Sequence, residues 1–396
     1  MRLTVISHSC VVDTNQQFYA ALEELGVTLQ LIVPALWKGD LTGELRPPSR
    51  WEDLCAQLTP VPVIMPGNVP LHAYRKSLGR LFYLFQPDAI YVENESYAVS
   101  TFQGALANRL SVRRPFLFRN NQNIAKAYPP PFAQAERFVL GQAACANLIN
   151  EDAGKVLRDK GFKGRVAYMP YGIDPGFHRP LDARGLRETL GLRGFVFGFA
   201  GRLVEEKGVR ELLDAFTRFH PEEEVSLLII GDGPLRQEVE DRLATPGMRG
   251  RGRLLPVVPH REVPLHLSAM DTLVLPSKST ATWREQFGRV LIEAVACGVP
   301  VIGSDSGEIP RLIERLKGGL VVPEGQAEPL HQAMRRMVHE RGLHDGLRED
   351  GRLEVEEQFA YESLAYRFKQ LLESIVADRK RGVADQDRLP AWVEEG

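Results

Sequence analysis

The chain has 396 residues, of which 44% are hydrophobic and 25% are charged, and its formal net charge at pH 7 is −2. This is the composition of an ordinary globular protein. It excludes a disordered, strongly charged chain and provides no basic excess for binding nucleic acid. The length exceeds what a single hydrophobic core usually supports, so we expect two domains.

The cysteines and the apolar runs indicate the compartment in which the protein works. The four cysteines form no CxxC pair and no Cys/His cluster with zinc spacing, which fits a reduced cytosol. The first residues lack the charged and apolar regions of a signal peptide, and no apolar run approaches the ~20 residues that cross a bilayer. We expect a cytoplasmic protein that binds no nucleic acid, with peripheral contact at a membrane left open.

In the first half of the chain, short apolar runs alternate with helical patterns. Strands are expected at residues 3–6, 29–33, 61–65, 89–92, 115–118 and 146–149, and helices at residues 15–25, 74–85 and 97–110. Continuously apolar strands with helices between them indicate a parallel sheet covered on both faces. For residues 74–85 we favour a core helix with a basic outer face over a membrane-facing helix.

The same order restarts in the second half. Strands are expected at residues 195–200, 225–230, 254–258, 272–275, 299–302 and 320–322, and helices at residues 207–219, 235–243, 287–297, 327–340 and 361–377. The prolines and glycines of residues 169–181 suit a hinge between the two sets. We predict one domain over residues 1–178, joined by a C-terminal helix at about 361–396, and a second domain over residues 179–360.

Two cations follow the first strand of the second set. The strand ends at Gly201, Arg202 lies in the polar loop, and Lys207 lies at the start of the next helix. In an open α/β sheet the ligand crevice lies beyond the carboxyl ends of the strands, so both side chains are placed to reach an anion. A guanidinium offers a fork for phosphate oxygens and an ammonium offers a mobile point charge. Two solvated surface cations are the alternative interpretation.

A pair of glutamates frames a glycine at the start of another helix. Glu285 precedes Gly288, and Glu293 lies one to two turns further along. The free N–H groups and the dipole of a helix that begins here suit a phosphate, and Gly288 lets that phosphate approach the backbone. A carboxylate such as Glu293 accepts hydrogen bonds from the two adjacent hydroxyls of a ribose. A lone glutamate on such a helix is usually solvated, but the two together favour a binding site.

Five short motifs recur in one order in the second half: Gly201-Arg202-Leu203 with Lys207-Gly208, Gly231-Asp232-Gly233-Pro234, Leu275-Pro276-Ser277, the two glutamates seven residues apart, and Gly298-Val299-Pro300-Val301. In this order and spacing they resemble the nucleotide-binding half of retaining glycosyltransferases of the GT-B type, family 4 (glycosyl transferases group 1). The resemblance is strong over residues 165–375 and weak in the N-terminal half. It implies an α/β chain with two Rossmann-like parallel-sheet domains that face a central cleft.

The resemblance also implies roles for matching positions. As catalytic residues, Arg202 and Lys207 would neutralise the donor diphosphate and Glu285 would contact hydroxyls of the donor sugar. Glu293 would hold the ribose. Further donor-binding positions, several acting through the backbone or near the base, are Gly201, Gly231, Val258, Gln286, Phe287, Gly288, Arg289, Val290 and Leu291.

The N-terminal half departs from the family pattern. Residues 7–13 replace a glycine-rich loop, and the run Arg119-Asn120-Asn121-Gln122-Asn123 stands where many members carry a histidine. Asn and Gln donate and accept hydrogen bonds but do not titrate. We expect this run to line a cleft, and the acceptor-side candidates are His8, Asn120, Asn121, Gln122 and Lys126.

The resemblance implies an enzyme that moves a sugar from a nucleoside-diphosphate sugar to a hydroxyl of a saccharide or lipid-linked acceptor, with retention of configuration. It implies no metal and no cofactor. The Asp385-Gln386-Asp387 tripeptide lies in a polar tail, and we interpret it as solvated rather than as a metal motif. A non-catalytic sugar-nucleotide binder and a sugar-nucleotide epimerase are the alternatives. A dehydrogenase is disfavoured because no GxGxxG follows the first strand.

Overall fold

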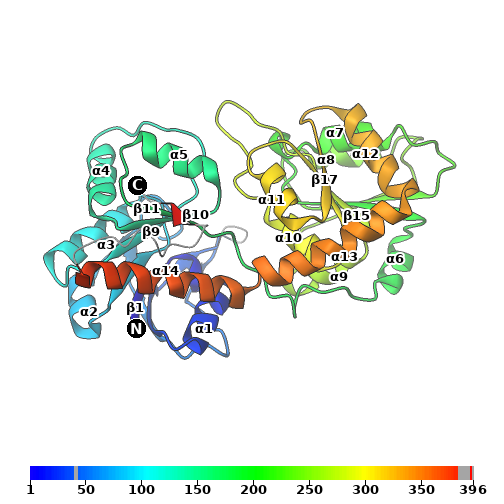
Figure 1. Ribbon diagram of the computed structural model, residues 1–396. Helices are drawn as coiled ribbons and strands as arrows, with labels where there is room; N and C mark the ends of the chain where they lie inside the picture. The colour runs from blue at the N-terminus through cyan, green and yellow to red at the C-terminus, as the bar shows by residue number, and fades with distance from the viewer. Residues whose placement is uncertain (40–42, 382–392, 395–396) are drawn as a thin grey trace. The chain divides into compact units, whose positions relative to one another are not determined.

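The computed structural model describes residues 1–39, 43–381 and 393–394. The chain divides into two compact units, residues 1–172 with 361–396 and residues 173–360 (Figure 1). The boundaries expected from the sequence were 1–178 with about 361–396, and 179–360. Each unit contains a parallel sheet between helices, so the predicted pair of α/β domains is confirmed.

The sheet of the first unit has the strand order β18-β11-β10-β9-β8-β1-β2-β5. Its strands are β1 Arg2–Ile6, β2 Thr28–Pro34, β5 Gln57–Val61, β8 Ala89–Val92, β9 Phe116–Asn120, β10 Cys145–Leu148, β11 Arg165–Tyr168 and β18 Val393–Glu394. All neighbours are parallel except β11 and β18. The chain order reverses between β1 and β8, which makes their carboxyl ends the topological switch point of this sheet.

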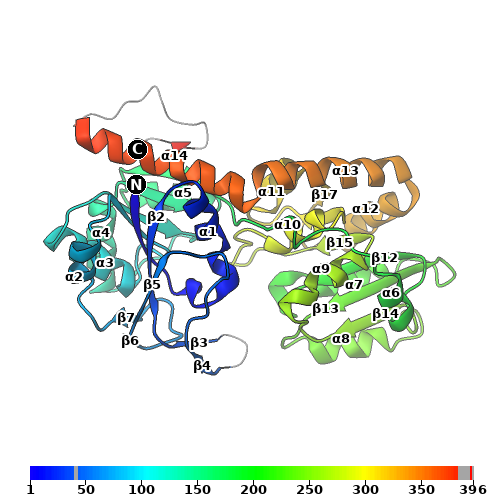
Figure 2. The ribbon, with the colours of Figure 1, turned by 90° about the horizontal axis from the view of Figure 1, so that it is seen from below.

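The helices of the first unit cover both faces of its sheet (Figures 1 and 2). They are α1 Gln17–Glu24, α2 Leu78–Phe85, α3 Val99–Leu110, α4 Phe132–Gln142, α5 Glu151–Asp159 and α14 Tyr361–Arg381. Because side chains alternate along a strand, Leu3 and Val5 of β1 share a core with Phe368 of α14, while Ile6 packs in the core that holds Phe82 of α2. The last helix therefore belongs to the first unit.

Several elements of the first unit differ from the expected ones. The strand expected at 61–65 is split, because β5 ends at Val61 before Pro62, which cannot donate to the ladder, and β6 Val63–Ile64 pairs with β7 Ala73–Tyr74. The helix expected at 74–85 begins only at Leu78, where Ser77 caps it by accepting from the Arg80 N–H at 3.3 Å. A second hairpin joins β3 Trp37–Lys38 to β4 Leu45–Arg46. The C-terminal helix, expected at residues 361–377, extends to Arg381, and the described residues 393–394 form β18.

The sheet of the second unit is wholly parallel, with the order β14-β13-β12-β15-β16-β17. Its strands are β12 Phe195–Ala200, β13 Val225–Ile230, β14 Gly252–Leu255, β15 Thr272–Leu275, β16 Val301–Ser304 and β17 Gly319–Val322. Its helices are α6 Arg184–Leu190, α7 Val209–Phe216, α8 Arg236–Leu243, α9 Val263–Ser268, α10 Arg289–Ala296, α11 Ile309–Leu316, α12 Ala327–His339 and α13 Arg341–Gln358. The order reverses between β12 and β15, which places the switch point there.

Period-2 alternation builds the core of the second unit. Phe197 and Phe199 of β12 pack with α7 and α12, while Gly198 between them meets Met270 on the other face, where a Cβ would lie 1.9 Å from the Met270 sulfur. None of the described helices combines the length and apolar character that crossing a bilayer requires.

The turn after β12 depends on a glycine. Residues Glu205–Lys207 form a 3₁₀ turn, and Gly208 at φ +67° separates them from α7, which is why the helix expected at 207–219 begins later. A Cβ on Gly208 would lie 1.9 Å from the carbonyl oxygen of Pro276, just after β15. This close approach brings the loops after β12 and β15 together.

We predict that Gly208→Ala lowers the free energy of unfolding by roughly 3 kcal/mol, because the left-handed backbone costs about 1–2 kcal/mol and the new methyl displaces the Pro276 carbonyl. Gly325→Ala is the matched control, since Gly325 has φ +70° but a Cβ added there would meet no atom within 4 Å. It should lose only the backbone contribution, about 1 kcal/mol. Equal losses in urea unfolding would show that the contact with Pro276 costs nothing.

Candidate functional site

The strongest contact between predicted site residues lies at the switch point of the second sheet. Lys207 Nζ lies 2.5 Å from Glu285 Oε2, although the two residues are 78 positions apart, and both side chains are largely buried. Ser277 donates a hydrogen bond to the same oxygen at 2.9 Å, and the Lys207 ammonium lies 5.2 Å from the centre of the Trp283 ring. The pair is thus a largely buried ion pair beyond the carboxyl ends of β12 and β15.

The N-terminus of α10 follows this pair directly. Gly288 caps the helix at φ +82°, and the helix begins at Arg289. The Leu291 N–H already donates to the Gly288 carbonyl at 2.9 Å, and its side chain is buried in the core. The N–H groups of Arg289 and Val290 belong to the first turn, which an α-helix leaves without intrahelical partners.

Glu293 lies one turn into α10 and is paired within the helix. Arg289 Nε lies 3.1 Å from Glu293 Oε1. Burial raises the pKa of Glu293, and the charge and hydrogen bond of Arg289 oppose that rise. An ion pair so arranged keeps a carboxylate available beside the helix N-terminus.

The remaining donor-side candidates differ in how far they are exposed. Arg202 and Gln286 are exposed, Val258 is half-buried in the loop after β14, and Phe287 is buried. Gly201 and Gly231 lie against each other, because a Cβ on Gly231 would be 1.9 Å from the Gly201 carbonyl oxygen. The structure therefore joins Lys207 directly to Glu285 and Arg289 to Glu293, and Arg202 forms no hydrogen bond or ion pair with these four described residues.

The switch point of the first sheet holds a carboxylate that the sequence reasoning missed. Glu93 directly follows β8, and its Oε2 accepts from Ser7 Oγ at 2.7 Å, Ser9 Oγ at 3.0 Å and the Tyr19 hydroxyl at 3.2 Å. Its Oε1 lies 3.0 Å from Arg119 Nη1. Glu93 could have been predicted from its position, because it follows the carboxyl end of an apolar strand as Arg202 does.

His8 lies between the two serines that Glu93 holds. Its ring centroid is 5.1 Å from that of Trp37 and 5.4 Å from that of His72. His8 Nδ1 is buried with no hydrogen-bond partner among the described residues. Burial lowers the pKa of His8, and the charge of Glu93 opposes part of this change. The lowered pKa favours the uncharged imidazole.

The amide run after β9 is hydrogen-bonded to its own loop and to the segments that follow β8 and β11. Ser96 donates to Asn120 Oδ1 at 3.3 Å, Asn121 Nδ2 donates to the Tyr171 hydroxyl at 3.2 Å, and Gln122 Oε1 accepts from the Tyr128 hydroxyl at 3.0 Å. Asn120 and Gln122 are buried and Lys126 is exposed. Much of the hydrogen-bonding capacity that we assigned to a cleft is therefore used to shape the loop.

Glu95 is a second missed carboxylate of this edge. The Asn121 N–H donates to Glu95 Oε1 at 3.0 Å. Burial raises the pKa of Glu95 to about 7, and hydrogen bonds from the backbone of Asn121 and Gln122 and the charges of Arg119 and Lys160 oppose part of that rise. Glu95 thus titrates near neutrality beside the amide run.

In the described part of the chain, no group of three or more His, Cys, Asp or Glu side chains could hold a metal ion. The Asp385-Gln386-Asp387 tripeptide lies outside the described residues.

Comparison with solved structures identifies the class of fold. The chain superimposes on sucrose-phosphate synthase of Thermosynechococcus elongatus with a TM-score of 0.70 at 18% identity, covering 95% of this chain and 99% of that one. It superimposes on Anabaena Alr3699/HepE in complex with UDP with a TM-score of 0.69 at 17% identity, covering 94% and 100%. The protein has the GT-B fold, as the sequence predicted.

Comparison of sequences finds a family model that matches within the second unit. Residues 187–354 match the model described as glycosyl transferases group 1, and the predicted resemblance is confirmed. The chain is 27% identical over 239 residues to 2-deoxystreptamine glucosyltransferase of Streptomyces kanamyceticus, covering 58% of this chain and 59% of the relative. It is 29% identical over 215 residues to D-inositol 3-phosphate glycosyltransferase of Jonesia denitrificans, covering 51% and 49%. The matches thus span between about half and three fifths of these relatives.

We predict that Glu95→Gln flattens the dependence of stability on pH. Between the ordinary glutamate pKa of 4.5 and about 7, the folded chain binds more protons at Glu95 than the unfolded chain, so its contribution to stability falls as pH rises through this window. Glutamine resembles the neutral carboxyl and does not titrate, so the variant should not lose this stability as the pH rises. Urea midpoints across this pH range measure the effect, with the exposed Glu52→Gln as control. A Glu95→Gln variant that keeps the wild-type slope would contradict the assignment.

Proposed function

We propose that the protein is a retaining glycosyltransferase that moves a sugar from a nucleoside-diphosphate sugar to a hydroxyl of a second substrate. The observation that carries this proposal is the Lys207–Glu285 pair beside the glycine-capped N-terminus of α10. It combines a cation and helix N–H groups, which suit a diphosphate, with a carboxylate, which suits sugar hydroxyls. The group 1 family domain over residues 187–354 supports it.

Binding of the donor would exchange partners within this site. A diphosphate oxygen competes with Glu285 for the Lys207 ammonium, and a sugar hydroxyl donates to the Glu285 oxygen that Lys207 releases. Glu293, oriented by Arg289, would accept from the ribose hydroxyls. Each charge keeps a partner in both states, so the exchange avoids leaving a buried charge alone.

The chemistry follows from these charges. As the bond from the anomeric carbon to the leaving oxygen breaks, the sugar gains oxocarbenium character and negative charge moves to the β-phosphate. Lys207, the exposed Arg202 and the N–H groups of the first turn of α10 would stabilise that charge. We propose that these groups suffice without a metal or a cofactor.

The acceptor would be a polyhydroxylated molecule. The relatives from Streptomyces kanamyceticus and Jonesia denitrificans are named for 2-deoxystreptamine and D-inositol 3-phosphate, both cyclic and polar. We propose a saccharide, cyclitol or lipid-linked saccharide bound by the first unit near His8, with the reaction in the cytoplasm. Anabaena HepE was solved with UDP and with UDP-glucose, which makes a UDP-sugar the first donor to test.

We predict that Lys207→Ala lowers kcat/KM for sugar transfer by ~30- to ~1000-fold, because losing one charge-assisted contact to the leaving diphosphate costs about 2–4 kcal/mol. Lys317→Ala, which removes an exposed lysine paired with Glu354, is the matched control and should leave the rate unchanged. Urea unfolding of both variants separates a folding defect from a catalytic one.

A change below about threefold would remove Lys207 from the site. Wild-type protein that binds the donor without any transfer or hydrolysis is a binding protein, and one that isomerises the sugar with no acceptor present is an epimerase; either result would replace the proposed activity.

We predict that Glu293→Ala weakens binding of UDP by ~10- to ~150-fold, because hydrogen bonds to a charged group contribute about 1.5–3 kcal/mol. Titration calorimetry with UDP and with UDP-glucose measures the loss, which should be similar for both because the ribose is common to them. Glu314→Ala, an exposed carboxylate of α11, is the control. Unaltered affinity in Glu293→Ala would exclude the ribose contact.

A further inference from the structure

The outer face of α2 in the first unit is apolar although it is exposed to solvent. Leu78, Phe82 and Phe85 form the inner face and are buried. Tyr83 and Leu84 lie on the outer face and are each 67% exposed. Exposed apolar side chains that lie singly need no explanation, but a helix that is apolar on both sides leaves a surface without a partner.

The end of α3 extends this surface. Leu110, its last residue, is 76% exposed. The next residue, Ser111, packs against α2, since a Cβ on Gly79 would lie 3.4 Å from the Ser111 Cβ. The two helices lie side by side on the first unit in both ribbon views (Figures 1 and 2).

Exposed cations surround these apolar side chains. Arg75 and Lys76 precede α2, Arg80 shares the outer face with Tyr83 and Leu84 at helical spacing, and Arg109 and Arg113 flank Leu110. Arg109 donates to Gln142 and Arg113 donates to the Arg109 carbonyl, so both of these hydrogen bonds go to neutral acceptors. We name these residues the α2–α3 face: Arg75, Lys76, Arg80, Tyr83, Leu84, Arg109, Leu110 and Arg113.

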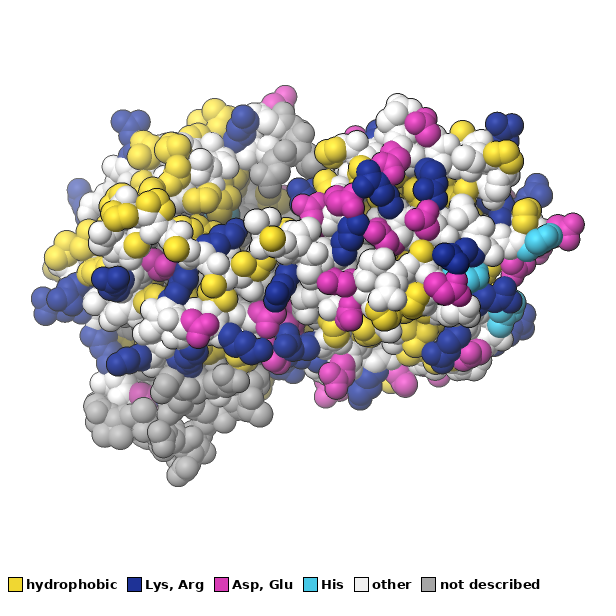
Figure 3. Space-filling model, turned by 90° about the horizontal axis from the view of Figure 1, so that it is seen from above, with side chains coloured by type: hydrophobic (Ala, Val, Ile, Leu, Met, Phe, Trp, Pro, Cys, Tyr) yellow, Lys and Arg dark blue, Asp and Glu magenta, His cyan; other side chains and the backbone are white. Residues whose placement is uncertain are grey.

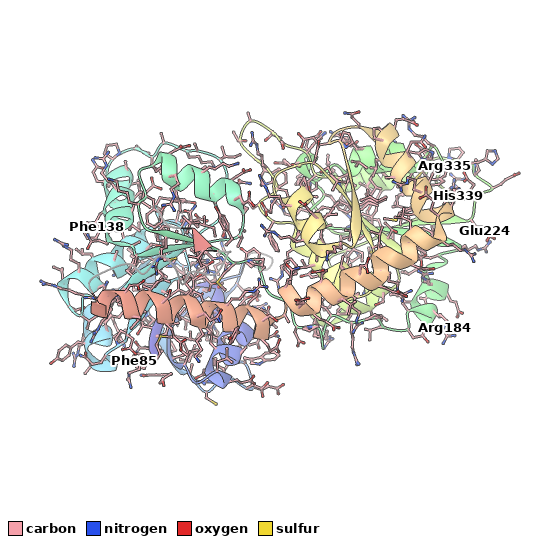
Figure 4. The ribbon with its side chains drawn as sticks, in the orientation of Figure 1. Phe85, Phe138, Arg184, Glu224, Arg335 and His339 are labelled. Atoms are coloured by element: carbon pink, nitrogen blue, oxygen red, sulfur yellow. The ribbon has the colours of Figure 1, made fainter. Side chains whose placement is uncertain are left out.

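The two chain segments that form this face contain no acidic residue. No Asp or Glu occurs between Asp53 and Asp88 or between Glu95 and Glu136. Glu136 of α4 is buried and paired with Lys160. The space-filling view from above shows the opposite side of the first unit, where α4 and α5 lie and where hydrophobic and basic side chains are also close together (Figure 3). On α4, the half-buried Phe138, labelled in Figure 4, lies 5.4 Å from the Phe102 ring of α3 and continues the apolar surface.

We propose that the α2–α3 face binds the surface of an anionic lipid bilayer. Apolar side chains enter the boundary between headgroups and acyl chains, a tyrosine sits at headgroup level, and arginine and lysine attract anionic headgroups. A second copy of this chain fits less well, since a symmetric dimer through this face would bring cations against cations. Nucleic acid would use the cations but not the three exposed apolar side chains. Membrane binding of this kind is independent of the transfer reaction.

The test is flotation of the full chain with vesicles of phosphatidylcholine alone and of phosphatidylcholine mixed with phosphatidylglycerol. We expect binding to the mixed vesicles that weakens as salt is raised, because surface charges are screened within about 10 Å at 0.1 M. Removing one cation should weaken binding about fivefold, so Arg80→Gln/Arg109→Gln should weaken it roughly 25-fold. Tyr83→Ser/Leu84→Ser should weaken it at least about tenfold, because it removes the apolar area that enters the interface.

Leu353→Ser on α13 is the matched control, because Leu353 is 66% exposed and lies in the second unit; it should bind vesicles as the wild type does. Thermal unfolding confirms that each variant is folded. The proposal is overturned if the wild type ignores the mixed vesicles, if it binds phosphatidylcholine equally well, or if Tyr83→Ser/Leu84→Ser binds like the control. Sedimentation velocity adds one more outcome: a wild-type dimer that the same variant dissolves would make this face a contact between two copies and would overturn the proposal.

Discussion

The candidate site of the second unit depends on one largely buried ion pair and on the turn that lets its two residues meet. Lys207 and Glu285 meet at 2.5 Å only because the loops after β12 and β15 touch, and they touch because Gly208 carries no side chain where the Pro276 carbonyl lies. Two charges in a partly enclosed place are costly unless each keeps a partner. A ligand that carries both an anion and hydroxyl groups can replace both interactions together. Its anion binds Lys207, and its hydroxyl donates to Glu285.

The carboxylates at the switch points of the two sheets have different sets of partners. In the second unit the carboxylates Glu285 and Glu293 are each held by one cation near a helix N-terminus, an arrangement that a phosphorylated ligand can rearrange. In the first unit Glu93 is surrounded by three hydroxyl donors and Arg119, an arrangement with little freedom left. This network holds the loop that carries His8, so that the proposed acceptor side is shaped before any ligand binds.

The amide run after β9 uses only part of its hydrogen-bonding capacity within the first unit, and its place in a cleft stays a prediction. Asn and Gln side chains at a strand end suggested hydrogen-bonding groups directed to a ligand, because buried amides need partners. The structure provides some of those partners through Tyr128 of the same loop, Ser96 after β8 and Tyr171 after β11. Among the described residues, Asn120 Nδ2, Asn121 Oδ1 and His8 Nδ1 are buried without a hydrogen-bond partner. Glu95, whose pKa burial raises to about 7, accepts a hydrogen bond from the Asn121 N–H.

Elements with a strong local signal could be predicted from the order of the amino acids. Continuous apolar runs predicted β12, β13 and β15 with the observed bounds, and the glycine before an apolar helix predicted the cap of α10. Elements with weak local signals were missed, such as β11, where only Val166 and Ala167 are buried, and the polar helix α13. Single prolines and caps moved other boundaries by a few residues, as at Pro62 and Ser77.

The meeting of distant residues, in contrast, was visible only once the chain was folded. Lys207 contacts Glu285, which lies 78 positions away in the sequence. Glu93 binds Ser7 and Arg119, which come from the neighbouring strands β1 and β9 or the residues that follow them. Helix α14, at the other end of the chain, packs in the core of the first unit. The physical reason is that a periodic pattern specifies which face of an element is buried, whereas the choice of partner depends on strand order and loop packing. Strand order and loop packing are determined by the contacts of the whole chain together, so no single position in the sequence reveals them.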